Sequence, residues 1–152
     1  MARLEIVKYP DTILRKTSKD VDKMTDENRR LFDEMASTMY ITQGIGLAAP
    51  QVGISKKMIV VDIGEGLLKL INPKIVSRKG VSSFDEGCLS VPDQSVKVKR
   101  AEEIVVSYTD DNNIHHQRNF QGLVARVIQH EIDHLNGKLI IDYLPWYKRL
   151  FL

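Results

Sequence analysis

The chain has 152 residues, of which 43% are apolar and 28% charged, and its formal net charge is +2. These values are typical of a globular protein and exclude collagen, a disordered chain and a disulfide scaffold, so we expect one domain over residues 1–152. Lysine and arginine are mixed with nearly as many acidic residues, and no nucleic-acid partner is predicted. No stretch approaches the roughly 20 apolar residues that span a bilayer, and the N-terminus lacks the apolar core of a signal peptide. We therefore expect a cytoplasmic location and no membrane partner.

The first predicted element is a helix over residues 26–42. Apolar residues recur in it at spacings of three and four, namely Leu31, Phe32, Met35 and Met39. Thr25 is suited to cap its N-terminus. We expect Gly44 to take the left-handed conformation that ends such a helix.

The middle of the chain is expected to form strands. β-Branched runs lie at residues 58–63 and 70–76, the second interrupted by the turn-forming pair Asn72-Pro73. Residues 103–108 and 114–120 flank a polar tetrad and predict a hairpin. Because a helical pattern returns after these strands, the order of elements predicts an α+β fold with a mainly antiparallel sheet.

The second predicted helix, from Gly122 to a stop at Gly137, carries the motif His130-Glu131-x-x-His134. Histidines four residues apart lie one above the other on the same helical face. Both rings can therefore reach one metal ion at about 2.0–2.1 Å. Glu131 lies about 100° round the helix, so its carboxylate can stand beside the ion and take a proton from bound water. The motif thus predicts half of a catalytic site for a divalent metal.

A catalytic site of this kind uses three protein ligands, so one more is needed. Downstream of the motif only Asp142 is available, and it lacks the helical placement seen in zinc peptidases. The upstream candidates are Asp85, Glu86, Cys88, His115 and His116. The last two flank the predicted hairpin turn and are expected to be ordinary surface residues. Cys88, the only cysteine, is favoured because Gly87 allows close backbone approach and a thiolate is a good ligand for a borderline ion.

A third segment, Gly44-Ile45-Gly46-Leu47-Ala48-Ala49-Pro50-Gln51, fits the dinucleotide-binding pattern G-x-G-x-x-A. The context excludes that interpretation, because the segment follows a helix instead of a strand and Pro50 disfavours helix at Ala49. A tight turn that requires glycines is the alternative, although it leaves Gln51 unexplained.

These segments resemble, in order, the three motifs of the peptide deformylases: residues 44–51, residues 86–90 (Glu86-Gly87-Cys88-Leu89-Ser90) and residues 129–135 (Gln129-His130-Glu131-Ile132-Asp133-His134-Leu135). The opening residues 7–14 are also similar to the family, and the resemblance covers nearly the whole chain. It implies a hydrolase that removes the formyl group from the N-terminal formylmethionine of nascent polypeptides. It also implies antiparallel sheets packed around a central HExxH helix.

By position, the resemblance implies that Cys88, His130 and His134 bind one divalent metal ion. The family's ion is usually Fe²⁺ in the cell, with Zn²⁺, Ni²⁺ or Co²⁺ able to occupy the site. Glu131 is implied as general base and acid, and Gln51 as a donor to the oxyanion. The backbone N–H of Leu89 is a second candidate donor.

Substrate recognition is expected from an apolar pocket for the methionine side chain, formed by Ile45, Gly46, Leu89, Leu123 and Val127. Plain core packing is the alternative role for these residues. Glu86 and Arg100 are expected to form an ion pair behind the metal ligands, as the family pattern suggests.

Three questions stay open from the sequence. Many bacterial deformylases continue into a C-terminal helix, whereas this chain stops at Leu152, so docking on the ribosome is left open; a monomer is expected. The alternative function is a metallopeptidase of the HExxH type, with a third ligand after the helix. A silent homologue that binds formylated peptides is a further alternative, although Cys88, Gln51 and Glu131 are all retained.

Overall fold

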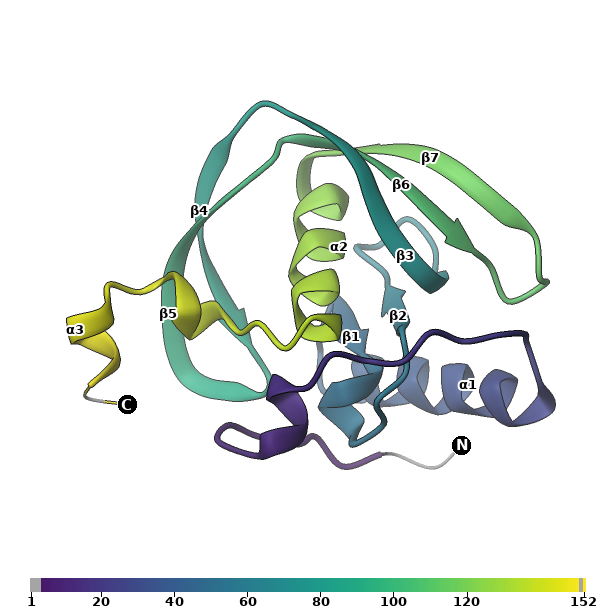
Figure 1. Cartoon of the computed structure of the whole chain (residues 1–152), viewed down its shortest axis with the longest axis horizontal. Helices are drawn as coiled ribbons and strands as arrows, with labels where there is room; N and C mark the ends of the chain where they lie inside the picture. The colour runs from purple at the N-terminus through teal and green to yellow at the C-terminus, as the bar shows by residue number, and fades with distance from the viewer. Residues whose placement is uncertain (1–3, 151) are drawn as a thin grey trace.

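Helix α2 (Gly122–Leu135) is the central element of the computed structural model, which describes residues 4–150 and 152 (Figure 1). A five-stranded antiparallel sheet with the order β1-β2-β3-β6-β7 lies on one side of it, and a two-stranded antiparallel sheet of β4 and β5 lies on the other. The predicted α+β fold, with antiparallel sheets around this helix, is confirmed. Among the described residues, no helix is both long and apolar enough to cross a membrane.

The strands and helices have the following bounds. The larger sheet contains β1 (Gly46–Ala48), β2 (Met58–Val61), β3 (Leu68–Lys79), β6 (Glu103–Thr109) and β7 (His115–Gln121). The smaller sheet contains β4 (Ser82–Cys88) and β5 (Val91–Arg100). The other helices are α1 (Asp26–Ile41) and α3 (Trp146–Arg149), with 3-10 turns η1 (Thr12–Arg15), η2 (Ala49–Val52) and η3 (Ile140–Tyr143).

Helix α1 begins as predicted but ends differently. The Thr25 hydroxyl accepts a hydrogen bond from the Asn28 N–H at 3.1 Å, as an N-cap does. The left-handed residue at the C-terminus is Gln43, with a φ of 59°, so the prediction of Gly44 was wrong by one position. Gly44 is the next residue, and its N–H donates to the Met39 carbonyl at 2.9 Å. This hydrogen bond spans six residues at the end of the helix, and in such a motif the left-handed residue stands before the last of the six, here before Gly44.

Strand β3 runs through Asn72 and Pro73, which were predicted to interrupt it. Its register with β6 shifts between Ile71 and Lys74, and Asn72 has a φ of 51°. The local feature is therefore a bulge within one strand. The Asn72 side chain holds the bulge in place, because it donates to the Val21 carbonyl at 2.8 Å and accepts from the Val21 N–H at 2.9 Å.

The predicted hairpin is present as β6 and β7. Its turn is closed by Asp110, whose side chain accepts from the N–H groups of Asn112 and Ile114. Strands β1, β4 and β5 were not predicted from the sequence.

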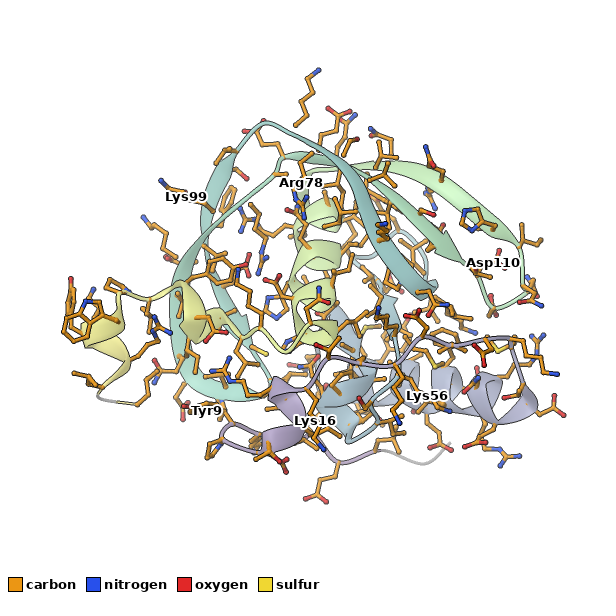
Figure 2. The ribbon with its side chains drawn as sticks, viewed as in Figure 1. Tyr9, Lys16, Lys56, Arg78, Lys99 and Asp110 are labelled. Atoms are coloured by element: carbon orange, nitrogen blue, oxygen red, sulfur yellow. The ribbon has the colours of Figure 1, made fainter. Side chains whose placement is uncertain are left out.

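Strand β2 divides the core because both of its faces are buried. Ile59 and Val61 pack in the cluster that includes α2, whereas Met58 and Val60 pack in the cluster that includes α1. A third cluster joins β5 to η3 and η1. Charged side chains such as Lys16, Arg78 and Lys99 lie on different parts of the surface (Figure 2). The end of β4 belongs to the third cluster, because Cys88 packs against it.

Candidate metal centre and active site

The three side chains predicted as metal ligands converge beside α2. The Nε2 atoms of His130 and His134 are 3.3 Å apart, and Cys88 Sγ lies 3.3 Å from His134 Nε2. All three ligand atoms lie within 4.8 Å of one another. Cys88 is the last residue of β4, so the smaller sheet carries the thiol to the helix that carries the histidines.

This donor set fits a divalent transition metal. A thiolate and two imidazoles suit borderline and soft ions, and three protein ligands leave a position for water or substrate. Glu131 Oε1 is buried and has no hydrogen-bond partner among the described residues. Glu131, His130 and Cys88 line the same cavity, so this carboxylate could accept a hydrogen bond from a water molecule on an ion held there.

Of the other sequence candidates for the third ligand, His115, His116 and Asp142 make their contacts elsewhere. Asp85 and Glu86 line the same cavity as Cys88 but do not belong to the described cluster of ligand atoms. His116 stacks on Tyr108 with ring centres 5.0 Å apart and bonds Asp110 at 2.6 Å, and His115 is exposed on β7. Asp142 accepts a hydrogen bond from Arg15 at 2.6 Å. Within the described part of the chain, the arrangement of a peptidase with a ligand after the helix is therefore not formed.

The two histidines of the cluster differ in their electrostatic surroundings. Burial lowers the pKa of His130, yet hydrogen bonds to Cys88 and Glu86 and the charge of Glu131 raise it to about 10. Burial lowers the pKa of His134 well below its ordinary value, which keeps this ring in the neutral form that binds metals. The two shifts run in opposite directions, so the surroundings favour positive charge on the His130 ring and disfavour it on the His134 ring.

The carboxyl group of Glu131 has a raised pKa. Burial raises it to about 7, although the charges of His130 and Arg100 lower it. A carboxyl group with a pKa near 7 can accept and release a proton at neutral pH. This property suits a residue that acts as base and then as acid.

Gln51 lies against the cluster as the third residue of η2 and is 2% exposed. Its side-chain amide donates to Ser90 Oγ at 3.2 Å and contacts Cys88 Sγ at 3.6 Å. Its Oε1 accepts from the Ala48 N–H at 3.0 Å, which fixes the amide so that the NH₂ end faces Cys88. Leu89 follows Cys88 in the two-residue turn between β4 and β5.

The predicted ion pair behind the ligands is present. Arg100 donates to both oxygens of Glu86, at 2.7 and 2.8 Å, and His130 Nδ1 lies 2.9 Å from Glu86 Oε1. Burial raises the pKa of Glu86, but hydrogen bonds from His130 and Arg100 lower it to about 2, so the carboxylate is ionised. An ionised partner on Nδ1 fixes the ring so that Nε2 faces the cluster.

Sequence reasoning missed two further groups around this pair. Arg126 of α2 also donates to Glu86, and Asp133 binds both Arg100, at 2.9 Å, and the Tyr143 hydroxyl, at 2.6 Å. The sequence did hold a signal for Arg126, because it lies four residues before His130 and therefore on the same helical face, and a buried cation requires a partner.

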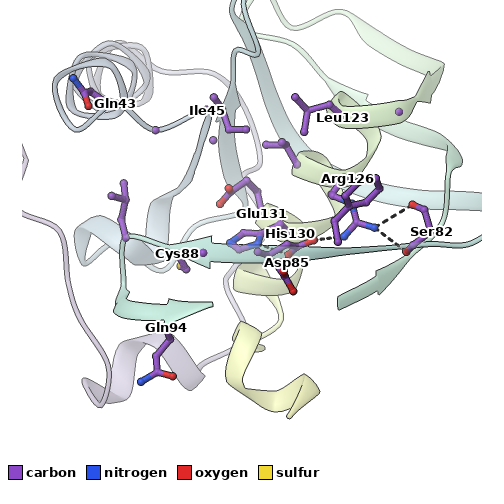
Figure 3. A pocket seen from close by; sticks show the side chains of 18 of the residues that line it. Gln43, Ile45, Ser82, Asp85, Cys88, Gln94, Leu123, Arg126, His130 and Glu131 are labelled. Carbon is purple, nitrogen blue, oxygen red and sulfur yellow. Dashed lines mark hydrogen bonds and ion pairs between the residues drawn. The ribbon is translucent and has the colours of Figure 1, made fainter. Parts of the chain in front are cut away.

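One cavity of about 1150 Å³ brings the predicted substrate residues together with the cluster. Its lining includes all five of them: Ile45, Gly46, Leu89, Leu123 and Val127. Ile45 and Leu123 are 43% and 52% exposed, so core packing does not account for these two, whereas Val127 is buried. Figure 3 shows both exposed side chains on the same side of His130 and Glu131.

The polypeptide deformylase family model matches residues 3–149 of the sequence. The chain belongs to the polypeptide deformylase family. The peptide deformylase of Halothermothrix orenii is 48% identical over 144 residues, which cover 93% of this chain and 94% of that protein. The crystal structure of a peptide deformylase from Legionella pneumophila has a TM-score of 0.94 and 41% identity, covering 99% of this chain and 90% of that one. That of the Ehrlichia chaffeensis enzyme in complex with actinonin has a TM-score of 0.96 and 41% identity, covering 99% and 94%.

The deformylase family confirms the resemblance drawn from the three motifs and the enzyme class that it implied. It also fits the site, because the family is metal-dependent and the cluster of Cys88, His130 and His134 can hold an ion.

Proposed function

We propose that this chain removes the formyl group from the N-terminal formylmethionine of nascent polypeptides, with one divalent metal ion bound by Cys88, His130 and His134. The observation that carries the proposal is the convergence of these three ligand atoms, within 4.8 Å of one another, in the wall of a cavity that Glu131 also lines. Membership of the deformylase family supports the same reaction.

The bound ion would lower the pKa of a water molecule and polarise the formyl oxygen. A thiolate with two imidazoles accepts Fe²⁺, Zn²⁺, Ni²⁺ or Co²⁺. We propose Fe²⁺ as the native ion, because the three motifs resemble those of the peptide deformylases, whose ion in the cell is usually Fe²⁺.

Glu131 moves the proton in this proposal. As the water oxygen bonds to the formyl carbon, Glu131 takes the proton that the water loses. The same carboxyl group then gives this proton to the departing nitrogen as the C–N bond breaks, so that formate and a free α-amino group remain. Its unpartnered Oε1 and its pKa of about 7 support both steps.

Gln51 and Leu89 stabilise the negative charge that develops on the formyl oxygen. The hydrogen bond from Ala48 holds the Gln51 amide so that its NH₂ group faces Cys88. The contact between this NH₂ group and the thiol is long, at 3.6 Å, so the same N–H can donate to an oxyanion instead. The Leu89 N–H, next to Cys88 in the turn, is the second donor. A donor of this kind contributes about 3–4 kcal/mol to transition-state binding.

The cavity holds the methionine side chain between its exposed apolar residues. Ile45 and Leu123 contact the thioether chain, with the buried Val127 between them and the catalytic residues. Gly46 offers backbone hydrogen bonds to an extended peptide. A cytoplasmic location, a monomeric state and action on the ribosome stay predictions.

The test compares formyl-Met-Ala-Ser with Met-Ala-Ser and with casein, at equal enzyme and metal concentrations. We expect formate release from the formylated peptide and no cleavage of either other substrate. Proteolysis without formate release would overturn the proposal and favour a metallopeptidase. The absence of both activities in a metal-loaded protein would also overturn it and would favour a silent homologue.

A further inference from the structure

Arg126 lies in the wall of the cavity with every contact of its guanidinium group made inside the protein. It is 8% exposed. Its Nη2 donates to the carbonyl and the hydroxyl of Ser82, at 2.8 and 3.1 Å (Figure 3), and its Nη1 donates to the Val98 carbonyl at 3.1 Å and to Glu86 Oε2. The group also stands over the Phe84 ring, 5.0 Å from its centre. One side chain of α2 therefore joins both strands of the smaller sheet.

Glu86 receives a hydrogen bond at each available side of its carboxylate. Oε1 accepts from Arg100 Nη2 at 2.8 Å and lies 2.9 Å from His130 Nδ1. Oε2 accepts from Arg100 Nε at 2.7 Å and from Arg126 Nη1. The carboxylate thus connects two guanidinium groups to a metal-binding histidine.

The charges of this network balance only when Arg126 is counted. Arg100 is shared between two carboxylates, those of Glu86 and Asp133. Arg126 supplies the second cation, and it is attached one helical turn before His130, on the same face of α2. Without it, two partly or fully buried carboxylates would compete for one guanidinium group, and Glu86 would be held against His130 less firmly.

We propose that Arg126 is a positioning residue, which holds Glu86 against His130 and fastens the β4 wall of the methionine cavity to the helix that carries the metal ligands. This inference rests on the proposed metal site. A group that orients a metal-binding histidine through a carboxylate acts on metal affinity, typically by about 10–100-fold. Arg126 is therefore expected to slow metal release, and not only to stabilise the fold.

The experiment uses the full chain loaded with Co²⁺ and measures the rate at which the ion passes to an excess of chelator. Arg126→Met keeps a long side chain and removes the charge, and we expect release about 10–100-fold faster than from the unchanged protein. Arg126→Lys restores the charge without the planar fork and should recover part of the difference. The visible absorption bands of bound Co²⁺ should change in Arg126→Met, because the geometry at His130 changes.

Two further variants separate this role from that of the cavity wall. Ser82→Ala removes one acceptor of Arg126, and Phe84→Leu removes the aromatic ring, while Glu86 keeps all its partners. Both should release Co²⁺ within about twofold of the unchanged protein. Unfolding of the metal-free proteins in urea measures the structural contribution of each side chain separately.

Release at the unchanged rate from Arg126→Met, with only the free energy of unfolding lowered, would overturn the inference. If Arg126→Met does not fold, Arg126→Gln decides by the same measurement, with at least about fivefold faster release expected and an unchanged rate contradicting the inference. Failure of the unchanged protein to bind Co²⁺ would instead overturn the proposed metal site, so the two failures are distinct.

Discussion

Gly46 and Glu131 lie so close together that a side chain at position 46 has no room. An added Cβ would stand 2.5 Å from Glu131 Oε2 and 2.7 Å from Val127 Cγ1. Strand β1 therefore touches α2 directly beside the carboxylate that we propose as the proton carrier. The glycine is required by this close approach and not by its backbone angle.

Gly46→Ala should consequently impair both folding and catalysis. The overlap forces the buried side chains of Glu131 and Val127 to shift, with an expected loss of about 1–3 kcal/mol in the free energy of unfolding. Displacement of Glu131 should lower kcat by about tenfold to a hundredfold. Urea unfolding and formate release measure the two effects. Gly44→Ala is the control for stability, since its nearest neighbour, Leu89 Cδ1, is 3.4 Å from the added Cβ; equal stability of the two variants would contradict the account.

Glu131→Gln should separate metal binding from proton transfer. The amide has the same shape but cannot take a proton from water, so kcat should fall by about 10²–10⁴-fold while the ion stays bound. Steady-state kinetics and metal analysis of the same preparation check this. Activity within a few-fold of the unchanged protein would remove Glu131 from the proton path.

Cys88→Ser and His134→Ala should each weaken metal binding. An alcohol is a poorer ligand than a thiolate for a borderline ion, and the loss of one ligand of three should weaken affinity by about 100-fold or more, ~3 kcal/mol. Competition with a chelator measures the affinity. His115→Ala is the matched control, because His115 lies exposed on β7 and should leave affinity unchanged. Unchanged metal content in Cys88→Ser would exclude the thiol as a ligand.

The network of Glu86 shows what the sequence could and could not predict. The pairing of His130 with His134 was predictable because their spacing on a helix is local, and Cys88, the proposed third ligand, followed from its chemistry. Arg126 was missed because its partner Glu86 is 40 residues away, so the pairing depends on how the smaller sheet folds against α2.

That sheet itself was missed for a related reason. Strand β4 exposes most of its side chains, so it shows no alternation of apolar and polar residues. In β5 the charged residue Arg100 occupies a buried position where an alternating pattern would have an apolar residue. The helix end was misplaced because a left-handed glutamine, Gln43, precedes the glycine that the usual rule favours. By contrast, the motifs of the site are short and specific, and the predicted site residues line or adjoin one cavity.

The Arg15–Asp142 contact should make stability depend on pH. Burial raises the pKa of Asp142, but hydrogen bonds from Arg15, at 2.6 Å, and the Leu139 N–H, at 3.0 Å, lower it below its ordinary value. Because the pKa is lower in the folded state, the stabilisation is fully present above about pH 4 and is lost as the pH falls through the folded value.

Asp142→Asn, measured as metal-free protein, should therefore be less stable than the unchanged chain by about 1 kcal/mol at pH 7, the value being reduced by the exposure of Arg15. The difference should shrink as the pH falls below 4. Asp20→Asn is the control, since Asp20 pairs with Lys57 on the surface and is 70% exposed; it should change stability little at any pH. A constant difference for Asp142→Asn across the pH range would contradict the prediction.

The central claim is that one metal ion, held by Cys88, His130 and His134, drives deformylation. Its most direct test is anaerobic titration of metal-free protein with Fe²⁺ while formate release from formyl-Met-Ala-Ser is measured. We expect no activity without metal and a linear rise that ends at one equivalent of Fe²⁺ per chain, with Cys88→Ser showing no such end point. Full activity in the metal-free protein, or an identical titration for Cys88→Ser, would contradict the claim.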